Sequence, residues 1–313
     1  MSIMARAGHR ANLVIAAALA ALGSGGCMAR NLVTAERMKN GLVLILPGIE
    51  GRSKYNADLL CGLADGGVPC AIEIFDWGTI VPLGGLVNLV AIERNREQAR
   101  RIADRVVQYQ RDYPNRPVHL VGHSGGGGLA VLALEALPPG HKVSSALLLA
   151  AAISPDYDLT RALHNTEAGI WNFYSSADVG YLKVGTGLFG TIDRRHTRAA
   201  GAVGFKMPTT TRESVRSTYA KLHSVSYKPA MAQAGHRGGH AGWTGRRFAS
   251  LWLAPVILAA SDDRAGYSIA LDDHLSRFWA QEKSGPPTRP NHATVTQMAE
   301  PGTVANPSSV PFK

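Results

Sequence analysis

The chain alternates short apolar runs with longer amphipathic stretches, and this alternation predicts its secondary structure. The run Leu-Val-Leu-Ile-Leu at 42–46 is apolar throughout and is stopped by Pro47 and Gly48. Such a run is typical of a strand that is buried on both faces of a parallel sheet. Four further strands are predicted at 68–77, 118–121, 143–153 and 170–175.

Amphipathic segments separate these strands. Helices are predicted at 55–63, 86–113 and 125–137, where apolar residues recur at helical spacing or Gly and Pro mark the ends. Regular alternation of strand and helix is typical of a parallel sheet with helices on both faces. The segment 247–260 reads equally as a closing helix or as one more strand, and 179–245 is expected to form long loops.

The same pattern predicts a single α/β domain with extensions at both ends. A length of 313 residues is enough for one α/β domain with a full core. The domain is expected over 41–282, after a short linker at 30–40. The Pro-rich segment 283–313 is expected to be a flexible tail.

The first 29 residues are predicted to be a signal peptide. Basic residues precede an apolar run at 11–22, which is shorter than the roughly 20 residues that a transmembrane helix needs. Small residues and then Cys27 follow, which resembles a bacterial lipoprotein processing site where the cysteine is lipidated. Ordinary cleavage after Ala29 is the alternative. Either route predicts an exported protein, in the periplasm or the cell envelope.

Charge and cysteine content add little about partners. Thirty-three Lys and Arg against 23 Asp and Glu give a formal charge of +10, which favours anionic surfaces and makes membrane-surface association a candidate. The basic residues are scattered without aromatic interleaving, so no nucleic-acid partner is expected. Cys61 and Cys70 either form a disulfide or stay reduced and buried. Neither has the spacing of a metal site, and no metal is expected.

The clearest chemical signal is the sequence Gly-His-Ser-Gly-Gly at 122–126. It places Gly-x-Ser-x-Gly between a buried strand and a helix, which is the context of a nucleophile elbow. Small residues at 122 and 126 suit the tight bend, and the helix N-terminus after Ser124 favours developing negative charge. Ser124 is therefore the candidate nucleophile.

An oxyanion hole needs two backbone amides near that serine. Gly125, the residue after the nucleophile, is expected to supply one. Pro47 and Gly48 end the first strand, and the amide of the next residue, Ile49, is the candidate for the second. The other interpretation of this segment is a plain turn forced by Pro47 and Gly48.

Over roughly 41–250 the chain resembles the α/β-hydrolase superfamily, with bacterial esterases and lipase-like members nearest. The resemblance is carried by Pro-Gly-Ile-Glu-Gly at 47–51, Phe-Asp-Trp-Gly at 75–78 and Gly-His-Ser-Gly-Gly-Gly at 122–127. It implies the α/β-hydrolase fold and a triad in the chain order Ser, Asp or Glu, then His. It implies no cofactor.

The acid of that triad is assigned by position. Asp178 lies just past the carboxyl end of the predicted strand at 170–175, where the acid of the superfamily usually sits, and it is the leading candidate. Asp156 and Asp158 follow the preceding strand. Asp262 follows Pro-Val-Ile-Leu-Ala-Ala, which imitates an acid-bearing strand.

The base is expected C-terminal to the acid, and Gly-His-Arg-Gly-Gly-His at 235–240 offers two histidines. His240 is preferred because flanking glycines allow close approach, with Trp243 placed to shield its ring; His236 is the alternative. His123, beside the nucleophile, is interpreted as a packing or support residue. The following are interpreted as surface or loop residues: His196, His223, His274 and His292. If Asp262 were the acid, His274 or His292 would become the base.

These candidates together predict a serine hydrolase that cleaves carboxyl esters through an acyl-enzyme, acting on a small-molecule or lipid ester. An envelope acyltransferase or a thioesterase would use the same residues. A binding protein that keeps the turn but lacks a working triad is the non-enzymatic alternative. The basic stretch with Arg194, Arg195, Arg198 and Lys206 suggests a preference for acidic or membrane-bound substrates.

Overall fold

The structure is a computed structural model that describes residues 31–77, 92–178, 191–209 and 212–261. The predicted signal peptide with Cys27 and the predicted tail at 283–313 lie outside these residues. Within the described helices, none is long and apolar enough to cross a membrane.

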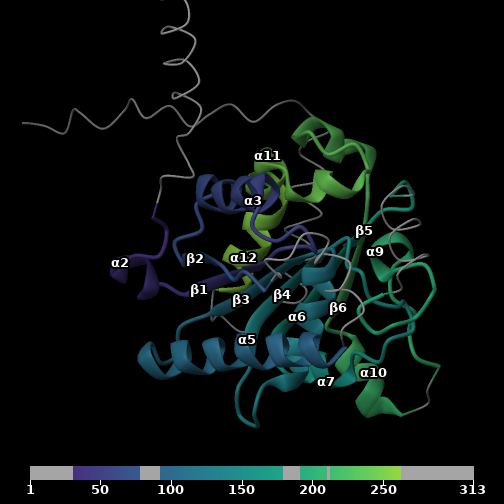
Figure 1. Cartoon of the computed structure of the whole chain (residues 1–313), viewed down its shortest axis with the longest axis horizontal. Coiled ribbons are helices and arrows are strands. Elements are labelled where there is room, and N and C mark those ends of the chain that lie inside the picture. The colour runs from purple at the N-terminus through teal and green to yellow at the C-terminus, as the bar shows by residue number, and fades with distance from the viewer. Residues whose placement is uncertain (1–30, 78–91, 179–190, 210–211, 262–313) are drawn as a thin grey trace, which may run out of the picture.

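Within the described residues, a sheet of six strands forms the centre of the molecule, and all six strands run parallel (Figure 1). The strand order is β2-β1-β3-β4-β5-β6, so β3 lies inside the sheet and β2 and β6 form its edges. The strands are β1 (Leu42–Leu46), β2 (Ala71–Ile74), β3 (Val118–His123), β4 (Val143–Leu149), β5 (Thr166–Tyr174) and β6 (Leu222–Ser226).

Helices cover both faces of this sheet (Figure 1). One layer holds α3 (Lys54–Asp65), α11 (Arg246–Phe248) and α12 (Ala254–Ala260), with a π-helical turn at Ala249–Leu253 between the last two. The other layer holds α5 (Ile92–Asp112), α6 (Gly125–Ala136), α7 (Thr160–His164) and α10 (Glu213–Tyr219). The described residues also form α2 (Ala35–Met38), α9 (Ala200–Val203) and two 3-10 segments, Pro229–Ala234 and His240–Thr244.

Along each buried strand, successive side chains point alternately toward the two helix layers, as the pleat of a strand requires. In β1, Val43 and Ile45 join the core under α3, whereas Leu42, Leu44 and Leu46 join the core under α5 and α6. All five are fully buried, which explains why the strand reads as an unbroken apolar run. The parallel sheet with helices on both faces confirms the expected fold class, the α/β-hydrolase fold.

Four local expectations differ from the structure. The segment at 247–260 is helical, so the strand interpretation of it is wrong. The stretch 179–245 carries the sixth strand, β6, besides its loops and short helices. Cys70 has a free, buried thiol, so no disulfide joins it to Cys61. The fourth difference concerns the predicted linker at 30–40.

Residues of that predicted linker pack on the edge of the sheet. Leu32 is buried and its carbonyl accepts a hydrogen bond of 3.1 Å from the amide of Ile72. The Arg37 guanidinium, on α2, donates to the carbonyls of Val68 at 2.5 Å and Cys70 at 2.9 Å. The ordered domain therefore begins before residue 41.

Candidate active site

Ser124 occupies a sharp turn between β3 and α6, at the carboxyl end of an inner strand. Its φ of 54° and ψ of −119° lie in a region that residues with a side chain rarely adopt. Backbone hydrogen bonds fix this conformation: the Ser124 amide donates to the Leu149 carbonyl at 2.9 Å, and the Ser124 carbonyl accepts from Ala152 at 2.9 Å. The strained turn leaves the half-buried Ser124 at the start of α6.

The glycines on either side of Ser124 are sterically required. A Cβ atom on Gly122 would lie 2.6 Å from the backbone carbon of Gly126, and one on Gly126 would lie 2.7 Å from the backbone carbon of Leu46. Backbone atoms inside a turn of this kind cannot move away cheaply. The structure therefore supplies the local reason for the Gly-x-Ser-x-Gly pattern.

The loop after β1 lies beside the first turn of α6. A Cβ atom on Gly125 would approach Ile49 Cγ2 at 3.1 Å and the Trp77 ring at 3.4 Å. The Trp77 indole N–H holds this loop by donating to the Pro47 carbonyl at 2.8 Å. The two residues predicted to form the oxyanion hole, Ile49 and Gly125, are therefore neighbours.

Asp178 and His240 are brought together across 62 positions of the sequence. His240 Nδ1 lies 2.6 Å from Asp178 Oδ2, and the side chains are 10% and 2% exposed. Asp178 follows β5, where its amide donates to the Ser175 carbonyl at 3.1 Å, and His240 begins a 3-10 segment. This pair has the acid–imidazole contact that orients a general base.

The surroundings of His240 lower the pKa of its imidazole. Burial lowers its pKa, because a charged ring loses hydration, while the hydrogen bond to Asp178 opposes this shift. Nearby His123 lowers the His240 pKa further, and the charge of Glu50 raises it. The net direction is down from the ordinary value of 6.5.

His123 connects the Ser124 turn to the His240 loop. Its ring centroid lies 4.7 Å from that of His240, and its Nε2 lies 3.2 Å from the His240 backbone carbonyl. Its Nδ1 lies 3.8 Å from Glu50 Oε1. The hydrogen bonds of the described residues include none to the Ser124 hydroxyl, and such bonds in free enzymes often tighten only when substrate binds.

His236, the alternative base, is a core residue. Its ring is fully buried and lies 4.0 Å from the Trp243 ring and 5.0 Å from the Phe248 ring, centroid to centroid. Its Nδ1 accepts a hydrogen bond from the Gly238 amide, and burial lowers its pKa to about 4. Trp243 therefore packs on His236 and not, as expected, on His240.

The alternative acids occupy other places. Asp156 pairs with Arg195 at 2.9 Å, and Asp158 accepts hydrogen bonds from Thr160 and Tyr219. The third alternative acid and the two bases that would accompany it lie outside the described residues: Asp262, His274 and His292.

The basic stretch is partly neutralised. Arg195 lies near two carboxylates, at 2.9 Å from Asp156 and 3.9 Å from Asp193, and Asp193 in turn accepts from the Ser154 amide and hydroxyl. These pairs weaken the argument that Arg195 attracts acidic substrates.

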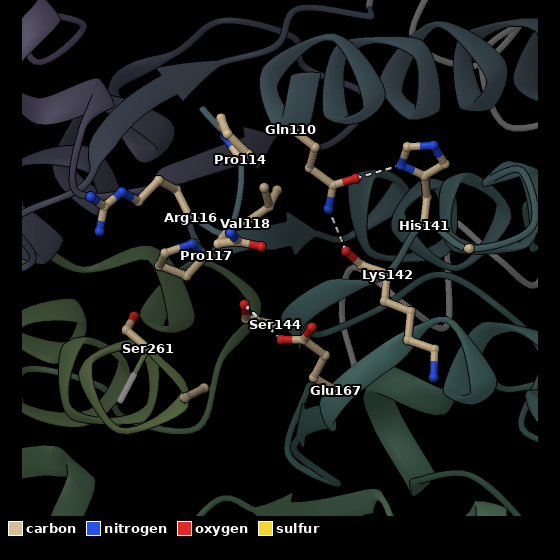
Figure 2. A pocket seen from close by; sticks show the side chains of 13 residues that line it. Gln110, Pro114, Arg116, Pro117, Val118, His141, Lys142, Ser144, Glu167 and Ser261 are labelled. Carbon is tan, nitrogen blue, oxygen red and sulfur yellow. Dashed lines mark hydrogen bonds between the residues drawn. The ribbon is translucent and has the colours of Figure 1, made fainter. Parts of the chain in front are cut away.

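A separate polar pocket lies at the end of the sheet where β3 begins, away from the end that carries Ser124 (Figure 2). It has a volume of about 510 Å³ and is lined by Val118, where β3 begins, together with Ser144 and Glu167. Since Ser124 follows the other end of β3, this pocket is not part of the candidate active site. Within the described part of the chain, no three His, Cys, Asp or Glu side chains form a metal-binding group.

No protein-family model matches the chain, and no curated protein sequence matches it. Similar solved structures include two whose descriptions name an esterase and a thioesterase. A Burkholderia cenocepacia protein described as a "putative aryl esterase" is 12% identical, with a TM-score of 0.31, over 78% of this chain and 92% of that one. A thioesterase domain from the curacin biosynthetic pathway is 15% identical, with a TM-score of 0.33, over 71% of this chain and 92% of that one. The strand order and the Ser124 turn of this chain carry the fold assignment.

Proposed function

We propose that the protein is a serine hydrolase that cleaves carboxyl esters through an acyl-enzyme on Ser124. The observation that carries this proposal is the buried Asp178–His240 pair, held through His123 beside the strained Ser124 turn. Acyl transfer needs a nucleophile, a base and an acid that orients the base. The candidates for these three roles lie on separate loops at the carboxyl end of the sheet.

In the proposed first step, Ser124 Oγ attacks the ester carbonyl while His240 Nε2 takes the hydroxyl proton. Asp178 holds Nδ1 of the same ring, which fixes the tautomer and stabilises the imidazolium that forms. The alcohol leaves with the proton that His240 returns. Water, deprotonated by His240, then attacks the acyl-enzyme and releases the acid and free Ser124.

The negative charge that develops on the carbonyl oxygen is assigned to the backbone amides of Gly125 and Ile49. Gly125 lies in the first turn of α6, where the helix dipole adds to the effect of its N–H group. The Trp77 contact with Pro47 fixes the loop that carries Ile49 in place before substrate arrives. Preorganised donors of this kind stabilise a transition state without reorganisation.

Small-molecule or lipid esters are the proposed substrates, and the exported location predicted from residues 1–29 would bring the enzyme to the cell envelope. Association with an anionic membrane surface is proposed on the net charge of +10 alone. Mass spectrometry of the mature N-terminus tests whether Cys27 is lipidated or whether cleavage follows Ala29.

Fluorophosphonate labelling together with p-nitrophenyl ester turnover tests the function. Ser124→Ala should abolish both signals, and His240→Ala should reduce kcat by about 10³-fold or more. Asp178→Asn should reduce kcat by about 10³–10⁴-fold, because the ring loses its orienting carboxylate.

Matched variants keep this test specific. Ser217→Ala, at an exposed serine of α10, and His141→Ala, in the pocket of Figure 2, should keep both signals. His236→Phe preserves aromatic packing and should retain turnover. Labelling that survives Ser124→Ala would overturn the proposal, and a folded wild type that never labels would favour the binding-protein interpretation. Turnover of thioesters but not oxygen esters would reassign the substrate.

A further inference from the structure

The pair Glu50–His123 lies between two loops that the proposed mechanism uses separately. Glu50 directly follows Ile49, the proposed oxyanion residue, and His123 directly precedes Ser124. The His123 side chain is nearly buried, with 5% exposed, and it contacts the His240 loop on one side and Glu50 on the other. Three elements of the site therefore meet at one imidazole.

The chemistry of the His123 contacts fixes the direction of one hydrogen bond. A backbone carbonyl can only accept, so His123 Nε2 must carry a proton and donate it to the His240 carbonyl over 3.2 Å. His123 Nδ1 faces the Glu50 carboxylate at 3.8 Å, which is an ion-pair distance when Nδ1 is protonated as well. The imidazole thus bridges a carbonyl and a carboxylate.

Glu50 is itself held in place. Its carboxylate folds back over the preceding turn, so that a Cβ atom on Gly48 would lie 3.0 Å from Glu50 Cδ. Burial raises the pKa of this carboxyl, but the nearby His123 and the amides of Gly48 and Glu50 outweigh it, and the net shift is downward. The Glu50 carboxylate is therefore placed to orient the His123 ring.

Two glycines, Gly238 and Gly239, directly precede His240 in the chain. Gly238 has a φ of 85°, and a Cβ atom on Gly239 would meet nothing within 4 Å. The Asp178 hydrogen bond orients the His240 ring, but it acts on the side chain and leaves the backbone carbonyl to other contacts. The His123 donor supplies such a contact, at the residue whose placement the proton transfer requires.

We propose that Glu50 and His123 are positioning residues that tie the backbone of His240 to the loop carrying Ile49. The inference rests on the proposed function, because it assigns roles only if His240 is the base and Ile49 lies at the oxyanion. Neither residue touches the reacting atoms. They keep the base and the oxyanion amide at a fixed separation while substrate enters and leaves.

Steady-state kinetics on p-nitrophenyl esters test the pair. Glu50→Gln and His123→Ala should each lower kcat by about 10–100-fold with KM within about twofold of wild type, since small displacements of a base are costly. The double variant should lose no more than the worse single variant, because both act through one contact. Thermal unfolding of each variant shows whether the fold is kept.

A conservative variant separates positioning from packing. His123→Gln places an amide N–H where Nε2 donates, so it should recover several-fold of the kcat that His123→Ala loses. Glu73→Gln is the matched control, because it breaks another partly buried ion pair, to Arg105 at 2.8 Å, on an edge strand away from Ser124. Its kcat should equal that of wild type.

Wild-type kcat in Glu50→Gln, or independent losses that multiply in the double variant, would overturn the inference. So would equal kcat in His123→Gln and His123→Ala when both are folded. If the wild type itself fails to react with the fluorophosphonate probe, the proposed function fails instead. The two failures are therefore distinguishable in one set of samples.

Discussion

A single imidazole, that of His240, sets the pH range of the proposed reaction. The ring must be neutral to accept the Ser124 proton, and its pKa is lowered chiefly by burial, with Asp178 opposing the shift. A lowered pKa means that the ring stays neutral at pH values where an ordinary histidine is already protonated.

We therefore expect the acid limb of the kcat/KM profile to fall below pH 6.5, the ordinary histidine value. Activity is lost as pH decreases through the His240 pKa, because protonation removes the base. Asp178→Asn should move the limb to still lower pH, since it removes the group that favours the charged ring. Initial rates between pH 4.5 and 8 on a neutral ester measure this, and a limb above 6.5 would contradict it.

Sequence reasoning identified residues from a local motif or from chain order, and it missed a contact between residues that are distant in the sequence. Ser124 was predicted from its immediate neighbours, and Asp178 and His240 from their order along the chain; their roles stay predictions. Glu50 gave no signal, because its contact with His123 joins residues 73 positions apart through the shape of two loops. The interpretation of His123 as a support residue becomes specific only with that contact.

At the scale of elements, the end of β3 packs directly against the start of α6 across the Ser124 turn. A methyl group on Gly122 would collide with the backbone at Gly126. We expect Gly122→Ala to lower the free energy of unfolding by about 1–3 kcal/mol or more, because overpacked backbone cannot relax. Urea unfolding measures the change. Gly239→Ala, with φ of −84° and open space at Cβ, is the control and should unfold as wild type does.

Strands with two buried faces were predictable, whereas the edge strand β6 was not. β1 is apolar at every position and β4 at all but Ser144 and Ser145, because both faces are covered. β6 reads Leu-His-Ser-Val-Ser, and among these residues only Val225 is buried, so it lacks that signal. The helix at 254–260 is equally apolar, and a short apolar run does not separate a buried helix from a strand.

At the scale of the whole molecule, the residues before β1 belong to the fold. Leu32 enters the core, Arg37 binds two carbonyls near β2, and the Tyr109 hydroxyl donates to the Met38 carbonyl at 2.6 Å. A chain begun at residue 41 should therefore be less stable than one begun at residue 31, by about 2–4 kcal/mol. Parallel thermal melts of the two chains test this, and equal melting temperatures would contradict it.

The thiol of Cys70 lies beneath the same segment. It is fully buried 3.5 Å from the Asn40 carbonyl, and burial raises its pKa to about 11, with Arg37 opposing the shift. An aqueous thiol reagent can reach it only after residues 31–40 lift from the sheet. The rate at which Cys70 is modified therefore reports how often residues 31–40 open locally while the rest of the domain stays folded.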